Sequence, residues 1–462
     1  MNLESMKIAD IRSIYFIGIG GIGMSAIARY FRSRGVPVSG YDRAETELIK
    51  DLIREGIDVH YNEDVEQIPK DADVVVYTPA IPKEHKELLY YQNNGYKVIK
   101  RSDILQIITE SSFNICVAGT HGKTTTTTMI AHLLRESDYG CNAFLGGISA
   151  NYNTNFWASE NNVCVIEADE YDRSFLKLSP DVAVVLAMDA DHLDIYGTEE
   201  NVKLAYKDFA ARVKEGGLLL KKFGMDRQLH TSQTLSYSLQ NDSADVCAEN
   251  IQLKDGGYEF DVAMPENYID NLRLSMGGMH NVENMTAAIA VASFLKIENE
   301  KIKKAVSTFK GVKRRFEYII KEKDIVFIDD YAHHPEELKA LINSVKSLFS
   351  QKKCTVIFQP HLFTRTRDFA QEFAEVLDMA HQVILLPVYP ARERPIEGVN
   401  ADLILSKMKL DNKLVKEKDE LLKWIENDFN KKRNREFGEV IVTAGAGDID
   451  KLVLSVKEIL DK

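Results

Sequence analysis

Seven residues between an apolar run and a helix-forming stretch have the composition of a phosphate-binding loop: Gly119, Thr120, His121, Gly122, Lys123, Thr124 and Thr125. Backbone N–H groups in such a loop can surround the β- and γ-phosphates of a nucleoside triphosphate. Lys123 would neutralise charge on the γ-phosphate, and the hydroxyl of Thr124 suits Mg²⁺. The loop is shorter than the common Walker pattern, because Val117 stands where that pattern has its first glycine. It predicts a site for nucleotide phosphates.

Acidic residues and a histidine follow two strands that the apolar pattern predicts at 163–168 and 182–188. The first strand ends in Asp169-Glu170-Tyr171-Asp172 and the second in Asp189-Ala190-Asp191-His192-Leu193-Asp194. In open α/β sheets, ligands bind at the carboxyl ends of parallel strands. A carboxylate and an imidazole beside nucleotide phosphates could complete the coordination of Mg²⁺, or of Mn²⁺. We therefore expect Glu170 and His192 to bind metal with Thr124, and leave Asp169, Asp191 and Asp194 open.

A second glycine-rich turn, with Gly18, Gly20, Gly21 and Gly23, lies between a predicted strand at 14–17 and a helix near 24–34. Glycines there allow a tight turn and a close approach of the backbone to a pyrophosphate. Asp42 ends the next predicted strand, at 36–41, where an acidic ligand of a ribose would stand. The turn suits any nucleoside diphosphate, including a UDP-sugar and NAD, so the motif alone does not distinguish these ligands.

Short apolar runs alternate with amphipathic stretches along all 462 residues, which is typical of α/β units with parallel sheets. The pattern divides into blocks at about 1–110, 111–312 and 313–462, and we expect three domains with these boundaries. Further strands are predicted at 74–78, 113–118, 325–328, 355–359, 383–386 and 439–442. Further helices are expected from 124, over 335–350 and over 368–380.

The chain is acidic, with a net charge of −12 and a pI of about 5.5, which argues against nucleic acid as its main partner. Five cysteines stand singly, without the spacing of a zinc site, and fit buried thiols in a reducing compartment. No run is apolar enough to span a membrane. We expect a cytoplasmic protein with no membrane partner, as a monomer or weak dimer.

Several motifs occur together in the order found in one family. Besides the two glycine-rich loops they are Glu167-Ala168-Asp169-Glu170, Asp191-His192-Leu193-Asp194, Gly278-Met279-His280-Asn281-Val282-Glu283-Asn284, Arg314-Arg315-Phe316-Glu317, Asp329-Asp330-Tyr331-Ala332-His333-His334-Pro335, Gln359-Pro360-His361 and Gly445-Ala446-Gly447-Asp448. On these residues the chain resembles the Mur ligase family over nearly its whole length. The resemblance implies a Rossmann-like N-terminal domain for the UDP-substrate, a central P-loop ATPase domain with a mostly parallel sheet, and a Rossmann-like C-terminal domain that closes over the site.

The resemblance also implies an activity, in which ATP phosphorylates the lactyl carboxylate of UDP-N-acetylmuramate and L-alanine attacks the acyl phosphate. The motif from Asp329 to Pro335 is the one that points to alanine. Roles carry over by position, with Lys123, Glu170, His192, His333 and Arg365 as catalytic residues. His280, Asn281, Asn284, Arg315 and Asp330 resemble contacts to the nucleotide, and Tyr331, His333 and Arg365 resemble the region that receives the amino acid. Leu362 departs from the family, many of whose members have arginine there.

Three alternatives stay open at this point. A murein-tripeptide-recycling ligase would share most of these motifs and join a peptide to the same UDP-sugar. A dinucleotide-dependent oxidoreductase would explain the turn at 18–23 but has no need of the loop around Lys123. A UDP-sugar-binding protein without catalysis would not need Lys123, Glu170 and His192.

Overall fold

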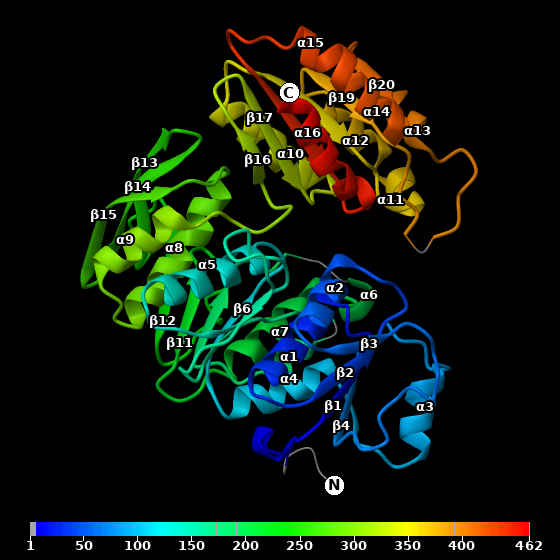
Figure 1. Cartoon of the computed structure of the whole chain (residues 1–462). Helices are drawn as coiled ribbons and strands as arrows, with labels where there is room; N and C mark the ends of the chain where they lie inside the picture. The colour runs from blue at the N-terminus through cyan, green and yellow to red at the C-terminus, as the bar shows by residue number, and fades with distance from the viewer. Residues whose placement is uncertain (1–5, 172, 190–192, 392, 462) are drawn as a thin grey trace. The chain divides into compact units, whose positions relative to one another are not determined.

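The computed structural model describes residues 6–171, 173–189, 193–391 and 393–461 (Figure 1). These residues form three sheets of five, ten and six strands. They divide into two compact units, the first comprising residues 1–250, 260–272 and 283–308, and the second comprising 251–259, 273–282 and 309–462. Each unit is described by itself below.

The five-stranded sheet of the first unit is parallel and has the order β3-β2-β1-β4-β5. Its strands are β1 (Ile14–Ile17), β2 (Val38–Tyr41), β3 (Asp58–His60), β4 (Val74–Tyr77) and β5 (Val98–Lys100). The helices that accompany it are α1 (Ile22–Ser33), α2 (Glu47–Arg54), α3 (Lys86–Asn93) and α4 (Arg101–Glu110). The strand order reverses direction beside β1, so the glycine turn that follows β1 lies where Rossmann-type sheets bind nucleotides.

The ten-stranded sheet has the order β15-β14-β13-β12-β11-β10-β6-β9-β7-β8. Its strands are β6 (Phe113–Ala118), β7 (Asn142–Phe144), β8 (Phe156–Trp157), β9 (Val163–Glu167), β10 (Val182–Val185), β11 (Leu218–Lys222), β12 (Thr234–Leu239), β13 (Val246–Lys254), β14 (Gly257–Met264) and β15 (Asn267–Leu274). The helices are α5 (Lys123–Glu136), α6 (Leu193–Tyr196), α7 (Glu199–Ala210), α8 (Met279–Phe294) and α9 (Asn299–Thr308). Strands β13, β14 and β15 each have residues in both units.

Three neighbouring parallel strands carry the predicted nucleotide site. Strand β6 pairs with β9 on one side and β10 on the other, with Val117 opposite Glu167 and Ala118 opposite Val185. The carboxyl ends of the three strands therefore meet at one edge of the sheet. All residues of β10 are buried, as are five of the six in β6, which explains their continuous apolar sequences.

The six-stranded sheet belongs to the second unit and has the order β16-β17-β21-β18-β19-β20. Its strands are β16 (Glu317–Lys321), β17 (Ile325–Asp330), β18 (Lys353–Phe358), β19 (Gln382–Leu385), β20 (Lys413–Val415) and β21 (Glu439–Ala444). Only β16 is antiparallel among the described pairs of this sheet. The helices are α10 (Pro335–Leu348), α11 (Phe363–Asp368), α12 (Ala370–Leu377), α13 (Ala401–Leu405), α14 (Lys418–Trp424), α15 (Asn430–Lys432) and α16 (Val453–Leu460).

The sheets confirm the predicted α/β class and the mostly parallel pairing. Predicted strands at 14–17 and 113–118 have the observed bounds, while the strand predicted at 182–188 already ends at Val185. An apolar cluster extends through the first two sheets and includes Phe31, Phe144 and Phe156. No helix among the described residues has the length and apolar content needed to cross a bilayer.

Candidate nucleotide and amino-acid sites

The phosphate loop connects β6 to α5 in a conformation that requires its two glycines. Gly119 has a φ of 142° and Gly122 has a φ of 81°, and both values disfavour residues with a side chain. A Cβ on Gly119 would lie 2.9 Å from the backbone nitrogen of Ala187, so this position is also crowded. The backbone N–H of Thr120 donates to the carbonyl of Ala187, which anchors the loop to the end of β10.

Lys123, the first residue of α5, lies between the loop and the carboxyl end of β9. Its Nζ donates to Glu170 Oε1 at 2.7 Å and to the carbonyl oxygen of Gly119 at 2.7 Å. The side chains are 15% and 2% exposed, so this is a buried ion pair. The structure thus brings together the two residues that the sequence predicted as γ-phosphate lysine and metal ligand.

Thr124 is held by a carboxylate that the sequence reasoning passed over. Its hydroxyl donates to Glu167 Oε1 at 3.1 Å, and the other oxygen of Glu167 accepts from the backbone N–H of Gly146 at 3.1 Å. Glu167 is the last residue of β9, and its position at the end of a strand beside the phosphate loop was the signal that could have identified it.

Asp189, beyond the end of β10, approaches the loop from the other side. Its Oδ2 accepts from the Thr120 hydroxyl at 3.1 Å and lies 3.6 Å from His121 Nε2. The predicted metal ligand His192 lies outside the described residues, as does Asp191. Asp169 makes a different contact, because its Oδ2 accepts from Arg101 Nη2 at 3.2 Å.

The oxygen atoms around Thr124 are of the chemical type that Mg²⁺ prefers as ligands. Thr124, Glu167 and Glu170 offer a hydroxyl and two carboxylates at one strand end, and Mg²⁺ prefers oxygen ligands. In the described part of the chain no group of three or more His, Cys, Asp or Glu residues forms a complete metal site. Mg²⁺ usually keeps waters and takes phosphate oxygens from its substrate, so such a complete site is not required.

The glycine turn after β1 is closed by the predicted acidic residue. Gly18 has a φ of 87°, and the backbone N–H of Gly20 donates to Asp42 Oδ2 at 2.9 Å. Gly21 precedes α1, whose first turn has no acidic residue. Asp42 thus lies at the turn and accepts a backbone hydrogen bond from it, and its contact with a ribose stays a prediction.

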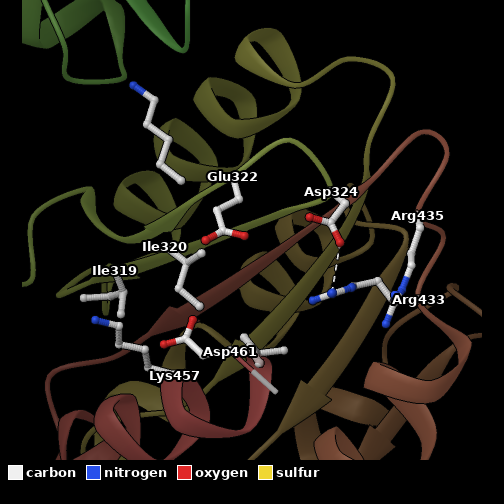
Figure 2. A pocket seen from close by; sticks show the side chains of 10 residues that line it. Ile319, Ile320, Glu322, Asp324, Arg433, Arg435, Lys457 and Asp461 are labelled. Carbon is white, nitrogen blue, oxygen red and sulfur yellow. Dashed lines mark ion pairs between the residues drawn. The ribbon is translucent and has the colours of Figure 1, made fainter.

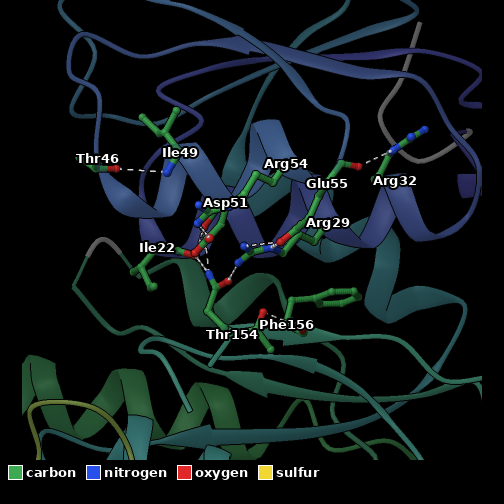
Figure 3. A network of polar contacts seen from close by, with 12 residues as sticks. Ile22, Arg29, Arg32, Thr46, Ile49, Asp51, Arg54, Glu55, Thr154 and Phe156 are labelled. Carbon is green, nitrogen blue, oxygen red and sulfur yellow. Dashed lines mark hydrogen bonds and ion pairs between the residues drawn. The ribbon is translucent and has the colours of Figure 1, made fainter. Parts of the chain in front are cut away.

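A buried polar network joins α1 to the segment before β8 (Figure 3). Asn155 Nδ2 donates to the carbonyl oxygen of Ile22 at 2.6 Å and to Ser25 Oγ at 2.9 Å, while its Oδ1 accepts from Arg29. Arg29 also pairs with Glu55 at 2.7 Å. Because Ile22 opens α1, this network fixes the glycine turn to the ten-stranded sheet.

In the second unit, Asp330 ends β17 and organises the neighbouring loops. Its two oxygens accept from the backbone N–H groups of Phe316 and Ala332, each at 2.7 Å. Burial raises the pKa of Asp330 to about 6 and that of the adjacent Asp329 to about 7. Arg314 lies between Asp329 and Asp450, at 3.6 and 3.3 Å, whereas the sequence had singled out the next residue, Arg315.

The predicted amino-acid region forms an aromatic and cationic cluster in this unit. The rings of Tyr331 and His333 lie 5.1 Å apart, and His333 lies 5.9 Å from the ring of His361. The Nδ1 of His333 is 2.9 Å from the carbonyl oxygen of Tyr331, so a neutral His333 carries its proton on Nδ1. Burial lowers the pKa of His333, and the charge of Arg365 lowers it further.

Arg365 has an unsatisfied donor in this cluster. Its Nη1 is buried, and no described residue accepts a hydrogen bond from it. A buried guanidinium N–H without an acceptor is costly, which indicates that an anionic ligand belongs there. Leu362, three residues earlier, has a φ of 70°, a strained value for leucine beside a predicted site.

The three residues predicted near adenine lie at the start of α8. Asn281 is buried, and its Nδ2 donates to the carbonyl oxygen of Gly277 at 2.6 Å. A Cβ on Gly122 would lie 2.9 Å from Asn284 Oδ1, so Asn284 lies against the phosphate loop. His280 is exposed beside Gly278. Their contact with adenine stays a prediction.

A polar cavity of about 550 Å³ lies elsewhere in the second unit, between β16 and α16 (Figure 2). Arg433 and Asp324 form an ion pair at 2.9 Å in its wall. The cavity contains none of the residues that the sequence predicted for catalysis or binding. We assign no part of the reaction to it.

Three family descriptions match successive parts of the chain. Residues 13–112 match the Mur ligase family, catalytic domain; residues 117–292 match the Mur ligase middle domain; and residues 314–447 match the Mur ligase, glutamate ligase domain. The chain belongs to the Mur ligase family and is an ATP-dependent ligase.

Among the relatives of this chain are ligases that share one name. The UDP-N-acetylmuramate–L-alanine ligase of Cytophaga hutchinsonii is 45% identical over 462 residues, which cover 98% of this chain and 97% of the relative. The enzyme of the same name from Porphyromonas gingivalis is 45% identical, covering 97% of this chain and 99% of its own. The crystal structure of UDP-N-acetylmuramate–alanine ligase from Thermotoga maritima has a TM-score of 0.80 at 27% identity, covering 97% and 98% of the two chains. A murein peptide ligase from Psychrobacter arcticus shares the fold, with a TM-score of 0.66 at 22% identity over 96% and 99%.

Proposed function

We propose that this protein joins L-alanine to the lactyl carboxylate of UDP-N-acetylmuramate, with ATP converted to ADP and phosphate. The observation that carries the proposal is the buried pair of Lys123 and Glu170 at the phosphate loop, in a chain 45% identical to ligases of that name. The similarity extends over the whole chain and therefore includes the cluster around His333 and Arg365, where the amino acid would bind.

The first step is phosphoryl transfer. A carboxylate oxygen of UDP-N-acetylmuramate attacks the γ-phosphorus of ATP, the bond to the β-phosphate oxygen breaks, and ADP leaves. Lys123, which pairs with Glu170 at 2.7 Å, would turn to the γ-phosphate and offset the repulsion between the two anions. Mg²⁺ bound near Thr124, Glu167 and Glu170 would supply further positive charge to the phosphates.

The second step is attack of the alanine amine on the acyl phosphate, followed by loss of phosphate. The amine must reach the acyl carbon as a free base. With the proton of His333 on Nδ1, the lone pair on Nε2 is available to accept a proton from the alanine ammonium. Arg365 would hold the alanine carboxylate through its buried Nη1.

The remaining assignments follow the same proposal. The glycine turn with Asp42 receives the UDP moiety, and Asn284, His280, Asn281, Arg315 and Asp330 contact ATP. Buried, free thiols at all five cysteines fit a reducing compartment, so we propose the cytoplasm as the site of the reaction.

Release of ADP in the presence of Mg²⁺, ATP and UDP-N-acetylmuramate tests the proposal. We expect turnover when L-alanine is added and only a trace without it. Mass spectrometry should identify UDP-N-acetylmuramoyl-L-alanine as the product. Robust turnover with the tripeptide L-alanyl-γ-D-glutamyl-meso-diaminopimelate and none with L-alanine would overturn the proposal in favour of a murein peptide ligase.

A further inference from the structure

Arg101, the first residue of α4, lies beside the glycine turn. A Cβ built on Gly23 would overlap Arg101 Nη1, so the guanidinium lies directly against the first turn of α1. Gly23 does not have a positive φ, so the close neighbour that its missing side chain leaves room for is the guanidinium of Arg101.

Arg101 has one anionic partner among the described residues and more donors than that partner can satisfy. The amino-terminal end of a helix carries partial positive charge, which repels a guanidinium, and the first turn of α1 has no acidic residue. Arg101 offers five N–H donors, yet among the described residues its only hydrogen-bond acceptor is Asp169, at 3.2 Å. Its side chain is 25% exposed, so water reaches only part of it.

Asp169 connects Arg101 to the ATP site. It directly precedes Glu170, whose carboxylate pairs with Lys123 at 2.7 Å. Arg101 thus contacts the glycine turn on one side and Asp169 on the other, within one compact unit. The residue after Asp169 is the ion-pair partner of Lys123 in the phosphate loop.

We propose that Arg101 binds the diphosphate of the UDP-sugar, with Asp169 as the positioning residue that orients its guanidinium. This assignment rests on the proposed function for the identity of the sugar nucleotide. The guanidinium matches phosphate oxygens in geometry, and the helix end adds N–H groups to the same anion.

Calorimetric titration without ATP tests the proposal on the full chain. For Arg101→Gln, which keeps a donor for Asp169, we expect roughly 10- to 100-fold weaker binding of UDP-N-acetylmuramate, typical of a lost charge-assisted hydrogen bond. Binding of UDP should weaken by the same factor, and KM for ATP should stay unchanged. Asp169→Asn should weaken both ligands less than Arg101→Gln does.

The matched control is Arg12→Gln, since Arg12 also pairs with one aspartate, Asp73 at 3.4 Å, at the opposite end of β1. It should bind both ligands as the wild type does. If Arg101→Gln binds UDP as tightly as the wild type does, the proposal is wrong. This holds even if the variant binds UDP-N-acetylmuramate more weakly, because the diphosphate is common to both ligands. If the wild type binds UDP-N-acetylmuramate in an Arg101-dependent way but forms no alanyl product, the proposed function fails while this assignment stands.

Discussion

Replacing Lys123 by methionine separates the structural role of this residue from its catalytic role. The variant leaves the carboxylate of Glu170, whose side chain is 2% exposed, without its ion-pair partner at 2.7 Å. Breaking a buried ion pair by removing one partner costs about 3–5 kcal/mol in the free energy of unfolding. The double variant Lys123→Met/Glu170→Gln buries no unpaired charge, and its stability should return to within about 1 kcal/mol of the wild type.

The double variant should regain stability but not catalytic activity. On the proposed mechanism both variants lack the charge that would face the γ-phosphate, so ADP release should fall by roughly 10³-fold, the effect of losing one strong electrostatic contact to a transition state. Urea unfolding followed by circular dichroism and a coupled ADP assay measure the two effects on the same samples. Lys214→Met is the control, because Lys214 pairs with Asp181 at 2.8 Å in the same unit, away from the loop. The reasoning is refuted if Lys123→Met keeps more than about a tenth of the activity, or if the double variant is no more stable than the single one.

Three further predictions concern other residues. Glu167→Gln loses one of the two acceptors that hold Thr124 and Gly146, and an Mg²⁺ titration of ADP release should show a roughly 10- to 100-fold higher requirement. Arg365→Ala should raise KM for L-alanine about 10- to 100-fold at unchanged KM for ATP; an unchanged KM for alanine would contradict the assignment. Because burial raises the pKa of Asp329 to about 7, the folded chain keeps a proton that the unfolded chain releases near pH 4. Stability of the second unit should therefore fall as the pH rises from about 4 to about 7, and thermal unfolding of Asp329→Asn should show a smaller fall.

The sequence predicted the strands around the phosphate loop well, because fully buried parallel strands have continuous apolar runs. The strand at 113–118 has its predicted bounds, and the one at 163–168 differs by a single residue. The strand predicted to reach 188 ends at Val185, and the apolar residues Leu186 and Ala187 lie in the loop after it, where the carbonyl of Ala187 accepts from the N–H of Thr120. Strands β13, β14 and β15 were not predicted, because each is only partly buried and mixes polar with apolar residues.

Residues of the candidate site could be predicted where they belong to a local motif. They could not be predicted where the contact joins residues that are far apart in the sequence. Glycine and lysine in the phosphate loop follow from local backbone requirements, and Glu170 from its place after a strand. Arg101 meets Asp169 across 68 positions; Asp169 lies in a motif after a strand, but Arg101 belongs to no local pattern that the sequence analysis used. Glu167 was given no role because the strand was predicted to continue to residue 168, which placed Glu167 inside the sheet and not at its edge.

The carboxylates around α5 give the physical reason for proposing a divalent cation. The first turn of α5 contains no acidic residue, yet Glu167 and Glu170 bring two negative charges to Thr124 and Lys123 from the end of β9. Lys123 pairs with Glu170, and ATP would add several negative charges beside both carboxylates. Such an arrangement repels its own nucleotide unless further positive charge enters with it. The same carboxylates that would weaken the binding of free ATP therefore favour its complex with Mg²⁺, which explains why a phosphate loop is lined by two buried or half-buried acids.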